Sequence, residues 1–249
     1  MDSGLYSAYT ALLSRTTALD IAADNLANTS TAGFHAGRAS FQGVLAEAQS
    51  SLPSQVGTAV NSFSTIVGRH LSDLQGTVQS TGNPLDLALN GTGYFMVRTP
   101  QGVRYTRDGE FQLSPTGTLT TRTGDAVLDA SGNAINVPSG QIKISPDGTL
   151  SVAADAGSAI AGRIAVMDPG SGMVQAESAS LYTTSDGSPA KPATGATIQQ
   201  GAIESANLDA VQGTVQLLSI QRQAEMMQRA LSVFHNDFDK TASEELARV

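Results

Sequence analysis

The chain contains no cysteine and no tryptophan, and aromatic residues make up only 5% of its 249 residues. The absence of cysteine excludes disulfides, thiolate metal ligands and thiol nucleophiles. Aromatic side chains are too few for a core built on large rings, whereas glycine is abundant at 25 residues. Because 40% of the residues are hydrophobic, the chain still has enough apolar side chains to form a packed core. The composition therefore favours β structure with many turns.

Positive charge is scarce as well. The chain has 14 Lys and Arg against 22 Asp and Glu, which gives a net charge of −8 and an isoelectric point near 4.7. Binding to phosphate backbones requires a basic patch, and no run of basic residues occurs in this sequence. We therefore expect no nucleic-acid partner.

Long hydrophobic runs are also missing. No window approaches the ~18 consecutive apolar residues of a membrane-spanning helix, so we expect no membrane insertion. The N-terminus lacks the basic region and the contiguous apolar stretch of a cleaved signal peptide. If the protein leaves the cytoplasm, we expect it to do so by a route that needs no cleaved signal.

Residues suited to metal binding are few and scattered. His35, His70 and His235 lie in different segments, and none has a ligand partner at helical spacing. The Asp-Gly turns lack the spacing of a calcium loop. We predict no metal site and no cofactor.

Two carboxylate pairs are the only candidates for catalysis. Asp108 with Glu110, and Asp125 with Asp129, have the residue types that glycoside hydrolases use as acid and base. Turn formation beside a glycine, as at Asp108-Gly109, explains the placement without catalysis. The sequence therefore predicts no catalytic residues, although a carboxylate-dependent cell-wall glycosidase stays open as an alternative.

The features that are present begin at the two ends of the chain, where apolar residues recur at alternating spacings of three and four. That repeat is typical of a coiled-coil seam, a narrow stripe that packs against a partner helix. The pattern predicts a helix over 3–28 and a second over about 203–240, with Ser205 or Asn207 as its N-cap. We predict that the two stripes form an assembly interface, made of Leu5, Tyr9, Leu12, Leu19, Leu26, Leu217, Ile220, Ala224, Met227, Leu231, Phe234 and Phe238.

The stripes allow two arrangements, because the helices can pack on each other within one subunit or against other subunits. The face of the first helix away from its stripe is Ser, Thr and Ala, small enough for close packing. In the second helix Leu208, Val211, Val215 and Leu218 form another stripe, offset by one residue. Both features favour packing between subunits. An isolated long helix is marginal in water, so we expect the termini to become ordered on assembly.

The middle of the chain is predicted to be β. Short apolar runs bounded by Gly, Pro and Asp indicate strands at 94–97, 102–105, 110–113 and 141–144. The hexapeptide Ser114-Pro-Thr-Gly-Thr-Leu119 recurs as Ser145-Pro-Asp-Gly-Thr-Leu150, which predicts that one hairpin is used twice. We predict an α+β fold, in which long N- and C-terminal helices form a coiled-coil-like layer around a central all-β domain. The expected divisions are an assembly helix at 1–33, an extended connector at 34–80, a β-rich domain at 81–200 and a second assembly helix at 201–249.

Four blocks of sequence resemble a known family. The segment Asn25-Leu-Ala-Asn-Thr-Ser-Thr-Ala-Gly-Phe34 is similar to the N-terminal signature of the bacterial flagellar basal-body rod and hook proteins. The segments 81–95 and 105–111 are similar to central blocks of that family, and 201–209 is similar to its C-terminal block. The blocks occur in the family's order and span nearly the whole chain. The residues that carry the N-terminal signature are Asn25, Leu26, Ala27, Asn28, Gly33 and Phe34.

The resemblance implies a structural role. Members of the family are axial proteins that leave the cell unfolded through the flagellar type III export apparatus, without a cleaved signal. Their terminal helices pack into the inner layer of a hollow tube around the export channel, and their β domains lie outside. The expected partners are other copies of the chain, other rod and hook proteins, and the export apparatus. The chain is too short for the extra domains of a typical hook protein, which favours a rod subunit, proximal slightly more than distal.

The sequence departs from the family pattern at His35-Ala-Gly37, where many relatives have Lys or Arg, and in the charged segment after Asn236. Besides the rod subunit and the glycosidase, a third hypothesis is a secreted adhesin that binds through its β domain.

Overall fold

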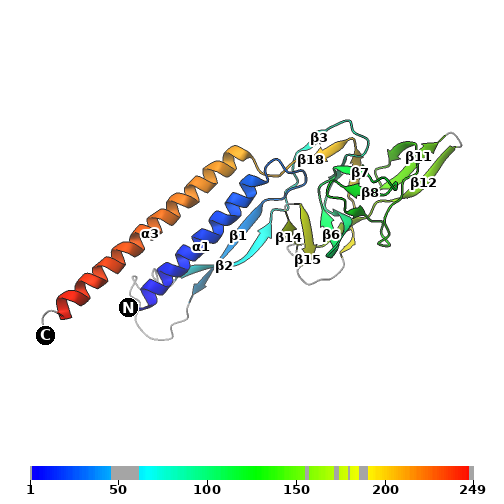
Figure 1. Ribbon diagram of the computed structural model, residues 1–249. Coiled ribbons are helices and arrows are strands. Elements are labelled where there is room, and N and C mark those ends of the chain that lie inside the picture. The colour runs from blue at the N-terminus through cyan, green and yellow to red at the C-terminus, as the bar shows by residue number, and fades with distance from the viewer. Residues whose placement is uncertain are drawn as a thin grey trace. The chain divides into compact units, whose positions relative to one another are not determined.

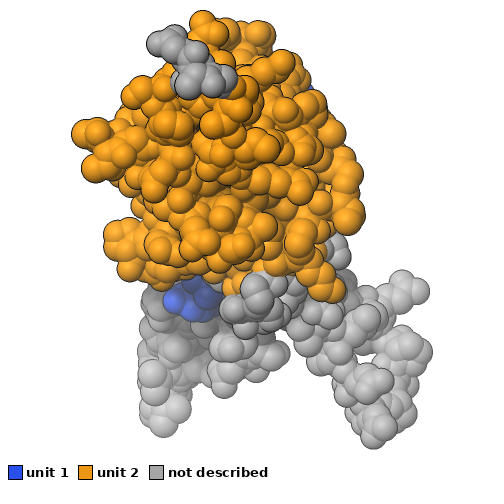
Figure 2. Space-filling model, turned by 90° about the vertical axis from the view of Figure 1, so that its right-hand side faces the viewer, with its two compact units in different colours: residues 1–26, 37–69, 210–249 blue, residues 27–36, 70–209 orange. Residues whose placement is uncertain are grey.

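The computed structural model describes residues 2–45, 62–154, 157–170, 174–178, 180–184 and 190–246. The chain divides into two compact units. Unit 1 comprises residues 1–26, 37–69 and 210–249, and unit 2 comprises residues 27–36 and 70–209. Figure 1 shows the elements, and Figure 2 colours the two units separately. Each unit is therefore built from segments that lie far apart in the sequence.

Unit 1 contains two helices and a pair of strands. Helix α1 spans Asp2–Ala27, and helix α3 spans Ala210–Leu246, which makes it about 55 Å long at 1.5 Å per residue. Both helices lack proline and are rich in good helix formers such as Ala, Leu, Gln and Met. Strand β1, Gly37–Leu45, pairs with strand β2, Ser62–Leu71.

Unit 2 is built of antiparallel β structure. Its largest sheet has nine strands, with the main order β14-β15-β6-β5-β9-β8-β7, while β13 pairs with both β5 and β16. A separate sheet has the order β10-β11-β12, and β17 pairs with β4 and β18 with β3. The strands are β3 Val78–Ser80, β4 Leu87–Asn90, β5 Tyr94–Thr99, β6 Gly102–Thr106, β7 Phe111–Leu113, β8 Leu119–Thr121, β9 Ala126–Val127, β10 Gln141–Ile144, β11 Thr149–Ala154, β12 Gly157–Arg163, β13 Val166–Asp168, β14 Val174–Ser178, β15 Leu181–Thr184, β16 Lys191–Pro192, β17 Thr197–Gln200 and β18 Ala202–Glu204.

The repeated hexapeptide forms the same hairpin twice. In the first copy, Ser114 N–H donates to the Thr118 carbonyl at 2.9 Å and Gly117 N–H donates to the Ser114 carbonyl at 2.9 Å. Ser145 and Gly148 make the same two bonds in the second copy, again at 2.9 Å. The glycines have φ of 81° and 88°, in the left-handed region that favours glycine over other residues. The prediction of a hairpin used twice is confirmed.

The core of unit 2 consists of two apolar clusters. The larger lies between the sheets and includes Leu87, Leu89, Phe95 and Leu150, none of which is exposed to solvent. Phe95 and Phe111 make an edge-to-face contact there, with ring centroids 5.1 Å apart. The smaller cluster contains Tyr94, Met96, Tyr105, Leu128, Ala165, Met167, Tyr182 and Ala190. The predicted central β domain is thus present, with a core of aliphatic side chains and few rings.

The predicted fold class is wrong in its helical part. Helices do lie at both ends, but a coiled-coil layer requires the leucine stripes to be buried against each other, and α1 buries a different face while its stripe leucines are only half-buried. Its buried side chains are Ser14, Ala18, Ile21, Ala22 and Asn25, whereas Tyr9 is 60% exposed. In the described residues, two helices accompany eighteen strands, so the protein is mainly β. Small side chains allow a closer approach to a neighbouring backbone than the leucines of a seam, which accounts for the buried face.

The second helix begins later than predicted. Residues 202–204 form strand β18, which pairs with β3 through Ala202 and Ser80, Ile203 and Gln79, and Glu204 and Val78. Helix α3 starts only at Ala210. Asn207 is therefore not a helix cap, and its side chain instead bonds the backbone of Ala36, Ser72 and Leu74.

Candidate functional site

Helix α3 carries apolar side chains on two opposite faces. Leu217, Ile220 and Met227 of the predicted interface are half-buried, and Ala224 is buried. Of the offset stripe, Leu208 is half-buried and lies before α3, whereas Val211 (72% exposed), Val215 (62%) and Leu218 (47%) point the other way and are exposed. Met226 (61%) and Val233 (57%) continue this exposed face along the helix. We call these five exposed residues the outer stripe. One face of α3 is thus covered within the chain while the other presents apolar surface to solvent.

The predicted stripe of α1 is only partly covered within the chain. Leu12, Leu19 and Leu26 are half-buried, and Tyr9 is largely exposed. The side chains of Leu5, Leu231, Phe234 and Phe238 lie outside the part of the chain whose side chains the structure describes.

The first signature residue, Asn25, fixes the end of α1 to the start of strand β1. Its side-chain amide donates to the Gly37 carbonyl at 2.8 Å, and its side-chain oxygen accepts from Gly37 N–H at 2.8 Å. The side chain thereby satisfies both backbone groups of Gly37 in a buried position. Asp carries no donor and Ala carries neither group, so the geometry selects Asn. Leu26 and Ala27 follow as the last turn, and Asn28 accepts hydrogen bonds from Thr31.

The second half of the signature docks in unit 2. Gly33 has a φ of 64°, and its N–H donates to the Glu204 carbonyl at 2.8 Å. A Cβ at this position would overlap the backbone of Arg107 and Asp108. Phe34 is buried, at 1% exposure, and its carbonyl accepts from Asn207 N–H. Gly33 is therefore required both for its backbone conformation and for the close approach of two chain segments.

A buried charge network lies beside this loop. Glu204 is fully buried, and its carboxylate accepts three hydrogen bonds. One comes from Arg107 at 2.9 Å, one from Gly76 N–H at 2.9 Å, and one involves the His35 ring at 3.1 Å. Arg107 is 4% exposed, also donates to the Gly91 carbonyl, and lies over the Tyr94 ring at 5.1 Å from its centroid. The network joins residues 35, 107 and 204 and thus ties both ends of unit 2 to its sheet.

Burial and charge shift the pKa values of groups in and beside the network. Burial alone raises the pKa of Glu204, but the hydrogen bond from His35 and the charge of Arg107 outweigh it, so the pKa lies below its ordinary value. Burial raises the pKa of Tyr94 to about 12, and burial also raises the pKa of Tyr182. Tyr182 accepts from His35 N–H at 3.0 Å and donates to the Gly33 carbonyl. Glu204 is therefore ionised in the folded chain, whereas both tyrosines keep their protons.

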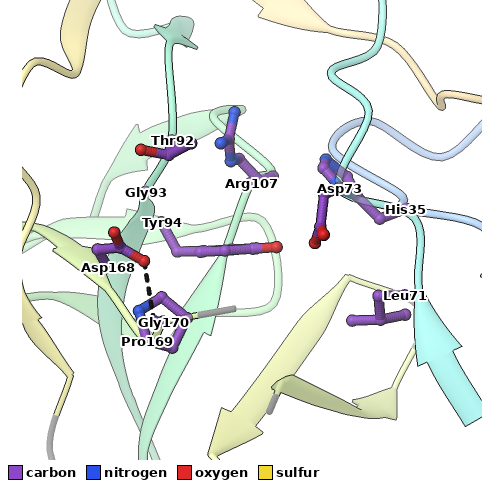
Figure 3. A pocket seen from close by; sticks show the side chains of 10 residues that line it. All are labelled: His35, Leu71, Asp73, Thr92, Gly93, Tyr94, Arg107, Asp168, Pro169 and Gly170. Carbon is purple, nitrogen blue, oxygen red and sulfur yellow. Dashed lines mark hydrogen bonds between the residues drawn. The ribbon is translucent and has the colours of Figure 1, made fainter. Parts of the chain in front are cut away.

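A cavity of about 240 Å³ opens next to the network (Figure 3). Figure 3 shows the ring of Tyr94 between Arg107 and Pro169, with the carboxylates of Asp73 and Asp168 on different walls. Asp168 accepts from Gly170 N–H at 2.9 Å. Nε of Arg107 is buried without a hydrogen-bond partner in the described structure.

Comparison with known proteins shows which family the sequence resembles. Residues 5–35 match the family described as flagella basal body rod protein, and residues 88–152 match the flagellar hook protein FlgE/F/G D1 domain. The chain is 31% identical to the flagellar basal-body rod protein FlgF of Caulobacter vibrioides over 93% of both chains. The chain belongs to the flagellar basal-body rod protein family. It is also 31% identical to FlgF of Escherichia coli, over 93% of this chain and 94% of the relative, and to the rod protein FlgG of Buchnera aphidicola, over 86% and 88%.

Membership of the rod family confirms the resemblance and the prediction of a structural rod subunit of the flagellar basal body. The matched segments include the signature loop with Gly33 and Phe34, and the sheet that carries Arg107. Sequence reasoning found the blocks 105–111 and 201–209, which contain Arg107 and Glu204, but it gave neither residue a role. Both are charged residues in polar surroundings, and nothing in their local sequence indicates burial.

The carboxylates of the two candidate pairs accept hydrogen bonds in turns or form a surface ion pair. Asp108 accepts from Glu110 N–H at 3.0 Å, as in an Asx turn, and burial raises the pKa of Asp108 to about 6. Glu110 forms an ion pair with the exposed Arg122 at 2.7 Å. Asp125 and Asp129 likewise accept hydrogen bonds within their own turns. Among the described residues, no group of three or more His, Asp or Glu is placed to hold a metal, and no helix is long and apolar enough to cross a membrane.

Proposed function

We propose that this rod-family protein is a structural subunit that polymerises through its terminal helices into a hollow axial shaft. The shaft transmits torque and encloses the export channel. The observation that carries the proposal is the outer stripe of α3, an apolar face along a helix of 37 residues that the rest of the described chain leaves uncovered. In a soluble monomer such a face is costly, and in a helical lattice a neighbouring subunit covers it.

The size of the stripe suits repeated, individually weak contacts. Full burial of one Val, Leu or Met contributes roughly 1.5–3 kcal/mol, and these five side chains are already partly covered. Their complete burial therefore contributes on the order of 5 kcal/mol per subunit. That gain is modest in a dimer, but it recurs at every position of a head-to-tail lattice that does not close on itself.

Helix α1 supports the same arrangement. Its small-residue face is buried within the chain, which leaves Tyr9 and Leu13 exposed, at 60% and 57%. The predicted interface residues Leu12, Leu19 and Leu26 are half-buried, so a neighbour can still cover part of each side chain. We propose that the outward face of α1 and the outer stripe of α3 contact different neighbours.

The proposal includes the route and the partners. The chain leaves the cell unfolded through the flagellar export apparatus, without a cleaved signal, and assembles with copies of itself and with other rod and hook proteins. The absence of cysteine supports this route, because a chain without thiols refolds outside the cell without disulfide errors. The subunit acts without catalysis, since the four candidate carboxylates serve turns and a surface ion pair.

The test is a charge placed in the outer stripe. Val215→Asp should abolish polymerisation of the purified chain, followed by sedimentation and electron microscopy, and should abolish motility when it replaces the natural protein. Gln228→Asp adds the same charge to an exposed polar position of the same helix and should leave both intact. The far-ultraviolet circular dichroism of the two variants should be the same, because unit 2 does not contain either residue.

Two results would contradict the proposal. Polymers from Val215→Asp that match the natural ones would exclude the outer stripe as a contact. Strong protection of residues 2–27 and 210–246 from hydrogen exchange in dilute monomer, unchanged on polymerisation, would show that the helices need no partner. Equivalent changes at Leu26 and Leu231 test the two predicted stripes in the same assays.

A further inference from the structure

The ring of His35 lies between two hydrogen-bond acceptors. Its Nδ1 is 2.9 Å from the Ser72 carbonyl, and its Nε2 is 3.1 Å from Oε1 of Glu204. The His35 side chain is 2% exposed, so both contacts are buried. Both ring nitrogens are therefore committed to protein oxygens.

Neither acceptor has a proton to give. The Ser72 group is a backbone carbonyl, which only accepts. The Glu204 carboxylate already accepts from Gly76 N–H and from the Arg107 guanidinium, both of which favour its ionised form. A neutral imidazole has a single N–H and satisfies one of the two contacts. Satisfying both requires an imidazolium with a proton on each nitrogen.

The charges around the ring are compatible with a cation. Glu204 from β18 is the direct counter-ion, and Asp73, which follows β2, lines the cavity that His35 also lines. Asp168 from β13 lines the same cavity. Arg107, after β6, opposes a second cation, but it is bonded to the other carboxylate oxygen and lies over Tyr94. The rings of Tyr94 and Tyr182 have centroids 6.1 and 6.5 Å from that of His35.

We propose that the signature loop of residues 28–36 is held on the β domain by a proton-dependent latch, in which doubly protonated His35 joins the Ser72 carbonyl to Glu204. Loss of one ring proton breaks one of the two contacts and turns the lone pair of that ring nitrogen toward a protein oxygen, which also has no proton to share. The loop that follows α1 then keeps its backbone hydrogen bonds to Glu204, Tyr182 and Asn207 but loses one side-chain contact of His35. The latch opens as the pH rises and closes as the pH falls. It is independent of the proposed assembly, because it acts within one subunit.

The direct test is nitrogen NMR of the full-length protein labelled with ¹⁵N-histidine. Comparison with His35→Gln assigns the His35 signals against those of the other two histidines. At about pH 6 the unmodified protein should show a proton on both ring nitrogens of His35. His70→Gln and His235→Gln identify the other two signals, so the assignment does not depend on the His35 variant alone. A single ring proton on His35 in the folded protein at that pH overturns the proposal.

The second test is the protection of the loop from hydrogen exchange, corrected for the intrinsic pH dependence of exchange. Protection of the Gly33 and Ala36 amides should fall roughly tenfold between about pH 6 and pH 9, as the loss of one charge-assisted hydrogen bond implies. His35→Arg supplies a cation that stays charged over this range, so its protection should not change. An equal fall in the natural protein and in His35→Arg contradicts the latch. A failure of Val215→Asp to block polymerisation bears only on the assembly proposal.

Discussion

Replacement of Gly33 by alanine tests the docking of the signature loop most directly. Two effects add at this position. At a φ of 64°, a residue with a Cβ lowers the free energy of unfolding by about 1–2 kcal/mol. Roughly 0.4–1 kcal/mol of this loss is offset, because alanine restricts the unfolded chain more than glycine does. In addition, the new Cβ would overlap the backbone of Arg107 and Asp108. The loop has to move away, which breaks the bond from Gly33 N–H to Glu204 and costs about 1–3 kcal/mol.

The matched control is Gly82→Ala. Gly82 has a φ of 75°, and a Cβ there would meet nothing within 4 Å, so this variant keeps the backbone strain and removes the overlap. We expect the free energy of unfolding to fall by about 1 kcal/mol for Gly82→Ala and by about 2–4 kcal/mol for Gly33→Ala. Urea unfolding followed by far-ultraviolet circular dichroism measures both. Losses that agree within about 0.5 kcal/mol would refute the claim that two chain segments meet at Gly33.

Three further predictions concern buried polar groups. Asn25→Ala should lower the free energy of unfolding by about 2–3 kcal/mol, because both backbone groups of Gly37 lose their partner, and Asn25→Asp should not restore it. Glu204→Gln should lower the free energy of unfolding by about 3–5 kcal/mol at neutral pH, since Arg107 keeps a buried charge without its counter-ion. Because the pKa of Glu204 is lowered from 4.5, the difference in stability between the variant and the natural protein should shrink as the pH falls below about 4.5, and a difference that stays constant in acid would refute this prediction. Burial raises the pKa of Asp108 from 3.8 to about 6, so this group should lower the stability of the natural protein as the pH rises from about 4 to about 6. Asp108→Asn should remove that loss and be more stable at pH 7 by at most about 3 kcal/mol, a limit that the partial exposure of Asp108 reduces; thermal unfolding across this pH range measures the difference.

The turns of this protein follow from local sequence. The two Ser-Pro-x-Gly-Thr-Leu segments form matching hairpins because proline, serine and glycine fix the turn through contacts no more than four residues apart. The position of Gly33 in the left-handed region was predictable for the same reason. The two helices were also predictable as helices, since their apolar residues recur with helical spacing and a helix makes its backbone hydrogen bonds between residues four apart.

The strands between 170 and 204 were not predictable from the same kind of pattern. This stretch is rich in Gly, Ser, Pro and Thr, which is typical of loops, yet it contains β14 to β18. Strand β17 pairs with β4, and β18 pairs with β3, across more than a hundred residues of sequence. A strand of this kind is stabilised by its partner and not by its own composition, so its pattern gives no signal alone.

The sequence by itself determined the helices at the ends, the β character of the middle and the family signature, because each depends on neighbours along the chain. Only the tertiary structure decided which face of α1 is buried, and that face consists mainly of small side chains and not of the leucine stripe. Tertiary structure also brought His35 to Glu204, 169 residues away, and placed Arg107 between that carboxylate and the Tyr94 ring. Burial creates the need for these partners, and burial is a property of the folded chain.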